Sequence, residues 1–361
     1  MEQYWEWFCS IPGIYRMQQE ILLRCFGTPE SVWMAGEQEL EHLKERGCRW
    51  IEKVQRYRKD CTPEKTVHMR REKGIRFISH DDGNYPDRLR RLPDHPYGLF
   101  YRGKLPPEES RAVAVVGARM CTRCGKETAE RMGGGIALAG GAVISGAAYG
   151  VDGAAQWAAL EKHGYSCAVL GCGVDRCYPA SNAALFHRLE AEGGIVSEFP
   201  PGTEPRRHHF PMRNRIISGL SDVVAVVEAR SRSGSLITAE FGAEQGKRVM
   251  AVPGRPGDEL SEGCNELIAQ GAEIILSVES FVKTVFPDYR KKQKKLSEDL
   301  ILAPSEKLVY SSLGLHSKSI WELEECTALS LAEMSECLMS LELKGLIRET
   351  ERNCYALSDD V

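Results

Sequence analysis

The stretch VAVVGARMCTRCG, from Val113 to Gly125, decides how this chain folds. Four apolar residues run into Gly117, Arg119 follows two positions later, and Thr122 precedes a helix-like segment. This order is typical of a buried strand that feeds a phosphate-binding turn at the N-terminus of a helix. The glycine spacing of the dinucleotide fingerprint is missing, so we expect the turn to hold another kind of anion.

Further apolar, β-rich runs follow this strand, and helical segments separate most of them. The runs cover 113–116, 142–145, 167–170, 195–199, 223–228, 249–252 and 273–276. Near-continuous apolar strands that alternate with helices indicate a mostly parallel sheet with helices on both faces. The sequence therefore predicts a doubly wound, extended Rossmann-like α/β domain.

Shorter patterns on either side of this sheet divide the chain into four predicted segments. These are a small helical domain of the helix–hairpin–helix or SAM type (1–72), the Rossmann-like domain (73–288), a basic linker (289–303) and a winged-helix-like domain (304–361). In the first domain, Tyr15 stands where a DNA-binding hairpin needs its second glycine after Gly13, which favours a packing role. In the last, acidic residues outnumber basic ones along the third helix until Lys344, which favours a structural or protein-contact role.

Composition narrows the class of protein. The net charge is −4, from 47 basic and 51 acidic residues, which argues against a generally basic nucleic-acid coat but allows a local basic groove. No secretory signal and no apolar run of membrane length stands out, so we expect a cytoplasmic protein. Most of the 13 cysteines should be free thiols, and the pair Cys121 and Cys124 lacks further ligands, so we expect neither a metal nor a cofactor.

Polar and glycine-rich clusters follow four of the predicted strands. In a doubly wound sheet these positions share one rim, where glycine turns and helix N-termini bind anions. One such turn is structural more often than not, but four on one rim favour a ligand site. The predicted phosphate-binding residues there are Gly117, Arg119, Thr122, Ser145, Gly146, Gly150, Gly173, Ser233, Gly234, Ser235 and Thr238.

The segment RRHHFPMRNR, residues 206–215, is basic, whereas the chain as a whole carries a net negative charge. It holds four arginines, two histidines and one aromatic residue, without an acid. We interpret it as a phosphate-binding patch in which Phe210 stacks on a base, in preference to an exposed basic loop. Arg213, Asn214 and Arg215 are included in the site. We expect the two arginines at a helix start, where the helix dipole disfavours cations and an incoming anion relieves this.

Catalytic machinery is sparse in the sequence. Asp152, Glu198, Glu228 and Glu240 lie near the predicted rim, but no nucleophile–base spacing accompanies them, and a structural role for Glu228 is at least as plausible as acid–base chemistry. A non-enzymatic binder is favoured. The alternative is a nucleotide-phosphate hydrolase, because the Ser233–Ser235 turn is loosely similar to the phosphate loop of cytokinin-activating phosphoribohydrolases, with Glu240 as the acid–base group.

A third class, an NAD-dependent oxidoreductase, is the least favoured. Gly171 and Gly173 begin like a dinucleotide fingerprint, but Arg176 stands where the fingerprint needs its third glycine.

Over residues 85–280 the chain resembles the DNA-processing protein A family, also called DprA or Smf. The motifs that carry the resemblance occur in family order: YPDRLRRLPDHPYGLFYRG, VAVVGAR, ISGAAYGVDGAAQWAAL, AVLGCGVDRCYPASN, FPMRNRIISGLSDVVAVVEA, SGSLITAE and VMAVPG. Three positions depart from the family pattern: Ala118 replaces a common serine, Tyr149 an arginine, and Ala180 a lysine.

The resemblance implies a protein that binds and protects single-stranded DNA during DNA uptake and natural transformation, and that loads the RecA recombinase onto it. It implies a homodimer formed through the Rossmann-like domain, with single-strand-binding protein as a further candidate partner. On this basis the anion of the opening stretch is a DNA backbone phosphate. We expect the Gly117 turn, the following helix N-terminus and Arg119 to hold it, and Arg213–Arg215 and Ser233–Ser235 to line the same groove.

Overall fold

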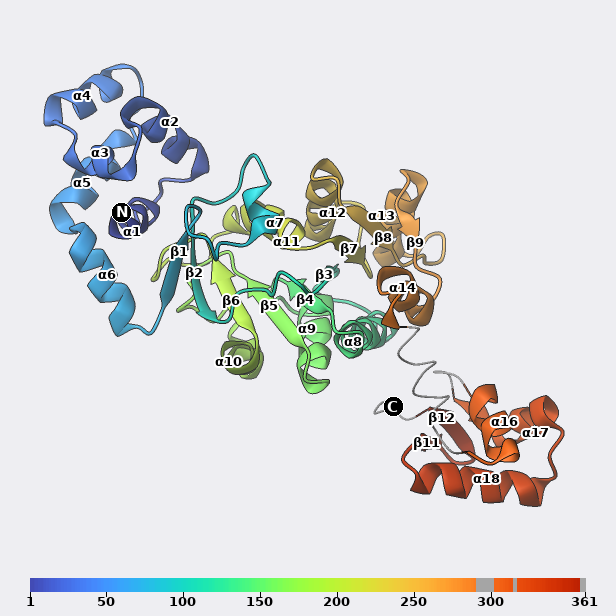
Figure 1. Ribbon diagram of the computed structural model, residues 1–361. Helices are drawn as coiled ribbons and strands as arrows, with labels where there is room; N and C mark the ends of the chain where they lie inside the picture. The colour runs from blue at the N-terminus through green and yellow to red at the C-terminus, as the bar shows by residue number, and fades with distance from the viewer. Residues whose placement is uncertain (290–301, 314–316, 358–361) are drawn as a thin grey trace. The chain divides into compact units, whose positions relative to one another are not determined.

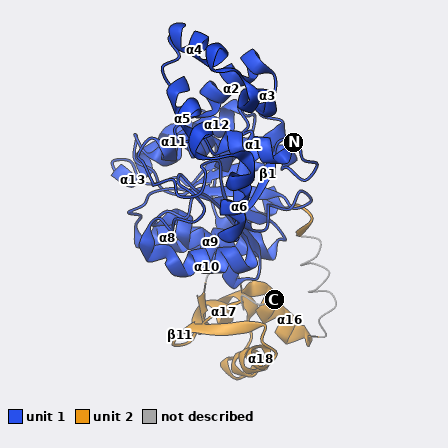
Figure 2. Cartoon of the chain, turned by 90° about the vertical axis from the view of Figure 1, so that its left-hand side faces the viewer, with its two compact units in different colours: residues 1–286 blue, residues 287–361 orange. Residues whose placement is uncertain are grey.

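The computed structural model of this chain describes residues 1–289, 302–313 and 317–357. They form two compact units, residues 1–286 and residues 287–361 (Figure 2). The first unit includes both the predicted helical domain and the predicted Rossmann-like domain. Most of the predicted basic linker, 289–303, lies outside the described residues.

A nine-stranded sheet is the centre of the first unit, in the order β1-β2-β6-β5-β4-β3-β7-β8-β9. The seven strands from β3 to β9 pair in parallel, and only β1 and β2 are antiparallel, which confirms the predicted mostly parallel sheet. The strands are β1 (Arg76–Ser79), β2 (Gly98–Gly103), β3 (Ala112–Val116), β4 (Ala142–Ser145), β5 (Tyr165–Val169), β6 (Gly194–Ser197), β7 (Val223–Val226), β8 (Arg248–Ala251) and β9 (Glu273–Ile274).

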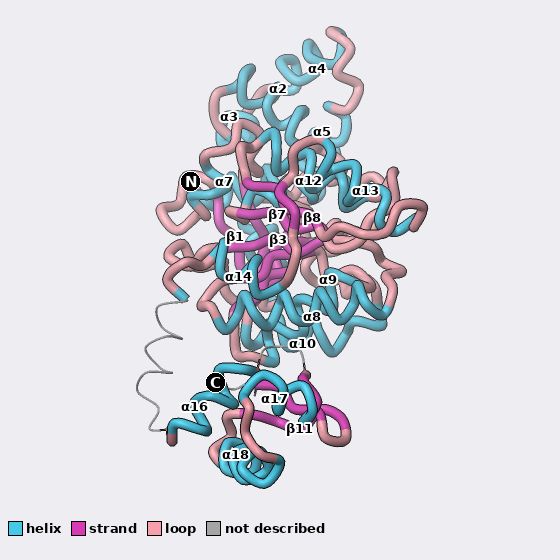
Figure 3. The backbone as a smooth tube through the Cα atoms, turned by 90° about the vertical axis from the view of Figure 1, so that its right-hand side faces the viewer, coloured by secondary structure: helices cyan, strands magenta, loops and turns pink. Residues whose placement is uncertain are grey.

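Helices cover both faces of this sheet, because its central strands are apolar on both sides (Figures 1 and 3). One layer contains α8 (Arg123–Leu138), α9 (Val151–Glu161), α10 (Ala183–Glu192) and α14 (Val278–Val285). The other contains α7 (Asp87–Arg90), α11 (His209–Gly219), α12 (Gly234–Glu244) and α13 (Glu259–Ala269). This arrangement confirms the doubly wound α/β fold class.

Six short helices precede the sheet and pack against its β1–β2 end. They are α1 (Glu2–Cys9), α2 (Arg16–Phe26), α3 (Pro29–Met34), α4 (Glu37–Glu45), α5 (Ile51–Asp60) and α6 (Pro63–Glu72). Phe8 and Ile11 from this segment share one apolar core with Phe77 and Phe100 of the first two strands. The N-terminal helices and the sheet are therefore joined by a common core.

The second unit has its own small core around Val309, Leu323 and Leu338. Its elements are α16 (Pro304–Ser312), β10 (Lys318–Ser319), α17 (Ile320–Thr327), α18 (Leu331–Leu343), β11 (Ile347–Glu351) and β12 (Cys354–Leu357). The three helices and the β11–β12 pair follow the predicted order, and β10 adds a third, short strand to that sheet.

Within the described ranges, no helix combines the length and the apolar character that crossing a membrane requires.

Candidate nucleic-acid interface

The strand order reverses at β3, which has β4 on one side and β7 on the other. Ligands of doubly wound sheets bind at such a point, outside the carboxyl ends of the strands. In this chain the carboxylate of Glu228 occupies that ligand position. The backbone N–H of Thr122 donates to Oε2 of Glu228 at 2.8 Å, and the Thr122 hydroxyl donates to Oε1 at 2.5 Å.

These contacts correct the expectation that a phosphate lies at the N-terminus of α8. Thr122 caps the helix by accepting from the backbone N–H of Gly125 at 2.9 Å, and the Glu228 carboxylate adds the negative charge that the helix dipole favours. A Cβ at Gly125 would lie 2.3 Å from the Glu228 carboxyl carbon. The anion at this turn is therefore the Glu228 carboxylate. Its role is structural, which is one of the two roles that the sequence analysis considered for it.

The turn after β4 is filled by Arg213. Its guanidinium donates to the carbonyl of Gly146 at 3.1 Å and to the carbonyl of Val169. A Cβ at Gly146 would lie 2.2 Å from Nη2 of Arg213, so glycine is needed where the guanidinium packs on the backbone. The hydroxyl of Ser145 donates to the carbonyl of Val115, also inside the fold.

The sequence analysis expected Arg213 and Arg215 at the start of a helix, but the structure places them elsewhere. Helix α11 begins at His209, with Pro211 in its first turn, where the missing N–H of proline costs no helical hydrogen bond. Both arginines follow that turn and are more than nine-tenths buried. Arg215 forms an ion pair with Glu198, so its charge already has a partner.

The Ser233–Ser235 turn holds α11 against α12. Asn214 donates from Nδ2 to the carbonyl of Gly234 at 3.0 Å, and the hydroxyls of Ser233 and Ser235 lie 2.7 Å apart. Thr238 is buried in α12, while Glu240 on the same helix is exposed. These contacts give the turn an internal structural role.

Four side chains lie close together where the loops after β3 and β5 meet helix α11. We call them the rim cluster: Arg119, Tyr178, Phe210 and Arg213. The Arg119 guanidinium carbon lies 5.3 Å from the centre of the Phe210 ring, and the Tyr178 ring lies 5.5 Å from that ring. Arg119 and Tyr178 are exposed and Phe210 is half-buried. The rim cluster thus offers a cation and two aromatic rings to solvent.

Arg213 lies beneath this surface, 5.9 Å from the Phe210 ring centre. Burial lowers its pKa to about 10, while the nearby Asp152 raises it, so the guanidinium stays protonated at neutral pH. Burial also raises the pKa of Asp152, and Arg213 opposes that shift. Arg213 is therefore the buried member of the rim cluster, and its guanidinium lies beneath the three members that reach solvent.

Gly150 fixes the relation between two loops of the rim. Its φ is +72°, and a Cβ there would lie 2.3 Å from the carbonyl oxygen of Ala118. The loop before α9 therefore crosses directly over the loop that carries Arg119. Tyr149, next to the crossing, is 49% exposed.

The predicted site residues thus separate into exposed and internal groups. Arg119, Thr122 and Gly234 are exposed, and Gly117, Gly150 and Ser233 are half-buried. The remaining predicted residues are buried: Ser145, Gly146, Gly173, Arg213, Asn214, Arg215, Ser235 and Thr238.

Tyr178 is the member of the rim cluster that the sequence analysis did not single out. It precedes Pro179 in a loop after β5, and neither its spacing nor a charge pattern marks it. Its contact with Phe210 joins residues 32 positions apart and needs the folded sheet. An exposed aromatic residue in a rim loop is the one signal that points to it.

The N-terminal segment reaches the basic segment through Tyr15. Its hydroxyl lies 3.1 Å from Nε2 of His209 and 3.4 Å from Nε2 of His208. The His209 ring also stacks on Phe199, with 4.2 Å between ring centres, and its Nδ1 lies 3.1 Å from the Gly171 carbonyl oxygen. These contacts fix the residue directly before Phe210.

In the part of the chain that the structure describes, no three His, Cys, Asp or Glu side chains are grouped closely enough to hold a metal ion. All 13 cysteines are free in the structure.

Comparison with known proteins identifies the sheet domain. Residues 76–286 match the family model of DNA recombination-mediator protein A. Protein Smf of Synechocystis is 30% identical to this chain over an alignment of 384 positions that covers 96% of each protein.

Solved structures give the same result. The structure of DNA processing protein A from Streptococcus pneumoniae matches with a TM-score of 0.65 and 33% identity, over 77% of this chain and 96% of that one. That of the Helicobacter pylori protein, described as having a unique single-stranded DNA binding mode, matches with a TM-score of 0.54 and 30% identity, over 60% of this chain and 97% of that one. Since the family model spans more than half of the sequence and the Smf relative nearly all of it, this chain belongs to the DNA recombination-mediator protein A family, DprA/Smf.

Proposed function

We propose that this chain binds single-stranded DNA at the rim cluster and acts there as a binder rather than an enzyme. The observation that carries the proposal is the exposed Arg119 guanidinium beside the Phe210 ring, with Tyr178 on the same surface. A cation for a backbone phosphate and an aromatic face for a base are the two elements of single-strand binding. The described single-stranded DNA binding of the Helicobacter relative supports the same ligand.

Preference for single strands follows from the aromatic rings. Phe210 and Tyr178 stack only on bases whose faces are free, and a duplex keeps its bases stacked on each other. Phosphate contacts by Arg119, with Arg213 beneath, add affinity without reading sequence. We therefore expect tight binding to single strands of any sequence and much weaker binding to a duplex.

The test is a titration of labelled single-stranded and duplex oligonucleotides by fluorescence anisotropy at several salt concentrations. Arg119→Ala should weaken single-strand binding and reduce the slope of log affinity against log salt by about 0.7, because one phosphate contact is lost. Arg123→Ala is the matched control, since Arg123 is 93% exposed and pairs with Glu127 on the next turn of α8. Equal affinity of Arg119→Ala and wild type would overturn the assignment.

We further propose a wider role, in which the chain protects the bound strand in the cytoplasm and, as a homodimer, loads RecA onto it; the match to a recombination-mediator family supports a role in recombination. RecA strand exchange on DNA covered with single-strand-binding protein tests this role. The full chain should shorten the lag, and Arg119→Ala should not. Sedimentation equilibrium tests the dimer, and a monomer at micromolar concentration would contradict it.

A further inference from the structure

The start of helix α2 is anchored to the segment between the first two strands of the sheet. Arg16 donates from Nε to the carbonyl of His95 at 3.0 Å, and its guanidinium carbon lies 3.9 Å from the centre of the Tyr97 ring. Directly before it, the backbone N–H of Tyr15 donates to Oε1 of Gln18 at 3.1 Å, which caps the helix. The side chain of Tyr15 therefore extends from a fixed backbone position.

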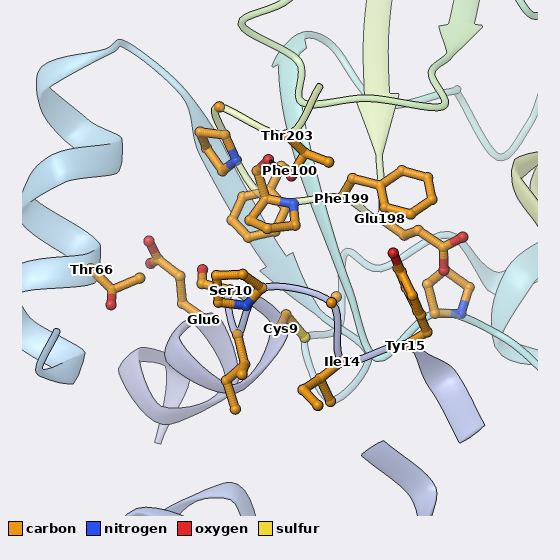
Figure 4. A pocket seen from close by; sticks show the side chains of 18 of the residues that line it. Glu6, Cys9, Ser10, Ile14, Tyr15, Thr66, Phe100, Glu198, Phe199 and Thr203 are labelled. Carbon is orange, nitrogen blue, oxygen red and sulfur yellow. Dashed lines mark hydrogen bonds between the residues drawn. The ribbon is translucent and has the colours of Figure 1, made fainter. Parts of the chain in front are cut away.

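This side chain reaches from the N-terminal helical segment to the carboxyl ends of the strands. Figure 4 shows Tyr15 pointing toward Phe199, which lies in the loop after β6, and the two ring centres are 6.3 Å apart. The Tyr15 hydroxyl lies 3.1 Å from Nε2 of His209, a side chain that is only 1% exposed. Tyr15 thus contacts the buried residue that directly precedes Phe210 of the rim cluster.

The hydrogen-bond partners of His209 decide which of its ring nitrogens carries the proton. Nδ1 lies 3.1 Å from the carbonyl oxygen of Gly171, which can only accept, so Nδ1 is the protonated nitrogen. Burial lowers the pKa of the His209 ring, and the neighbouring His208 lowers it further, so the ring is neutral at neutral pH. Nε2 is then an acceptor, and the Tyr15 hydroxyl donates its proton to it.

Gly171 connects the His209 ring to the Phe210 ring. Its carbonyl accepts from His209, and a Cβ at this glycine would lie 3.1 Å from Cδ1 of Phe210, so the aromatic ring rests on the same short piece of backbone. Loss of the Tyr15 hydroxyl leaves Nε2 of His209 buried without its donor, which favours other orientations of the imidazole. Such a rotation releases the Gly171 carbonyl and changes the surface that supports Phe210.

We propose that Tyr15 is a positioning residue of the single-strand site: its hydroxyl holds His209 and, through Gly171, orients the Phe210 ring for stacking on a base. The inference rests on the proposed function, because it adds a residue to that same site. Phe210 touches the strand, whereas Tyr15 acts without touching it. The N-terminal helical segment thereby sets the strength of DNA binding, although none of its side chains belongs to the rim cluster.

Anisotropy titrations of the full chain with single-stranded DNA at several salt concentrations test the proposal. Tyr15→Phe keeps the ring beside Phe199 and removes only the hydroxyl, and we expect affinity to fall about three- to tenfold, since one orienting hydrogen bond is lost. The slope of log affinity against log salt should stay that of wild type, because no phosphate contact changes. Tyr57→Phe is the matched control: it removes a hydroxyl 3.5 Å from Thr66 in the same helical segment and should bind like wild type.

A double-mutant cycle asks whether Tyr15 acts through Phe210. In the Phe210→Leu background, Tyr15→Phe should cause no further loss of affinity, because the ring that it orients is gone. Equal affinity of Tyr15→Phe and wild type, a reduced salt slope, or the same loss in both backgrounds would each overturn the inference and leave the proposed function standing. If Phe210→Leu alone bound like wild type, the proposed function would fail and the inference with it.

Discussion

Thr122 and Glu228, which are 106 positions apart in the sequence, are joined by two hydrogen bonds across the point where the strand order reverses. The carboxylate takes the position at the N-terminus of α8 that in related folds is available to a bound phosphate. An anion of the chain itself thus stabilises the helix, and the proposed DNA binding is left to the exposed side chains next to it.

Replacing Glu228 should therefore affect stability more than DNA binding. Glu228→Ala removes the acceptor of the Thr122 N–H and should lower the free energy of unfolding by about 1–2 kcal/mol in urea titrations. Its affinity for single-stranded DNA should stay the same or rise, because a negative charge leaves the rim. If Glu228→Ala bound DNA as weakly as Arg119→Ala, the division between capping and binding would be wrong.

Phe210 should contribute to binding through stacking and not through charge. Phe210→Leu keeps an apolar side chain but removes the aromatic face, so affinity for single strands should fall by about 1–3 kcal/mol per stacked base. The salt slope should remain that of wild type, in contrast to Arg119→Ala. Anisotropy titrations at several salt concentrations measure both quantities. A reduced slope for Phe210→Leu would mean that the substitution has disturbed a phosphate contact.

Gly150→Ala should be strongly destabilising, because the new Cβ would meet the Ala118 carbonyl and the residue needs a positive φ. We expect a loss of more than about 2 kcal/mol in the free energy of unfolding. Gly140→Ala is the matched control: Gly140 has a similar φ of +78° but no atom within 4 Å of the added Cβ. Urea unfolding should show a loss of about 1 kcal/mol in the free energy of unfolding for the control. Equal losses for Gly150→Ala and Gly140→Ala would contradict the role of Gly150 in the loop crossing.

The C-terminal unit should lose stability at low pH through Glu306. Hydrogen bonds from Lys344, Ser340 and the backbone of Ala303 lower its pKa from an ordinary value of 4.5 to about 2. A carboxyl group whose pKa is lowered in the folded state contributes its full stabilisation when the pH is above its ordinary pKa. This contribution disappears as the pH falls from 4.5 through 2.

Glu306→Gln should therefore be less stable than wild type at neutral pH, and the difference should shrink between pH 4.5 and 2. Hydrogen–deuterium exchange of peptides from α16 and α18, corrected for the intrinsic rate, measures it. A difference that does not depend on pH in this range would contradict the role of the ion pair with Lys344.

The sheet could be predicted from the sequence because its central strands are buried on both faces and read as apolar runs. Val113–Val116 and Ala142–Ser145 are examples in which periodicity alone locates a strand, and the turns after them follow from glycine and helix-capping chemistry. The position of Arg119 in an exposed turn follows from the same pattern.

The partners of the charged residues could not be predicted in the same way. Local sequence suggests that Arg213 and Arg215 meet an anion, but tertiary contacts supply carbonyls to the one and Glu198 to the other. Burial of an arginine depends on residues far along the chain, so a basic segment does not reveal which of its charges face solvent. The place of Tyr178 in the rim cluster could not be predicted either, because only the folded loops bring it into contact with Phe210.

The apolar core shared by the N-terminal helices and the first two strands limits how this protein can be shortened. A fragment that begins at Arg76, where the family match starts, would leave Phe77 and Phe100 without the side chains that shield them from water. The same cut would remove Tyr15 from His209, the neighbour of Phe210. Truncations meant to isolate the proposed DNA-binding domain should therefore aggregate or bind weakly unless residues 1–75 are retained.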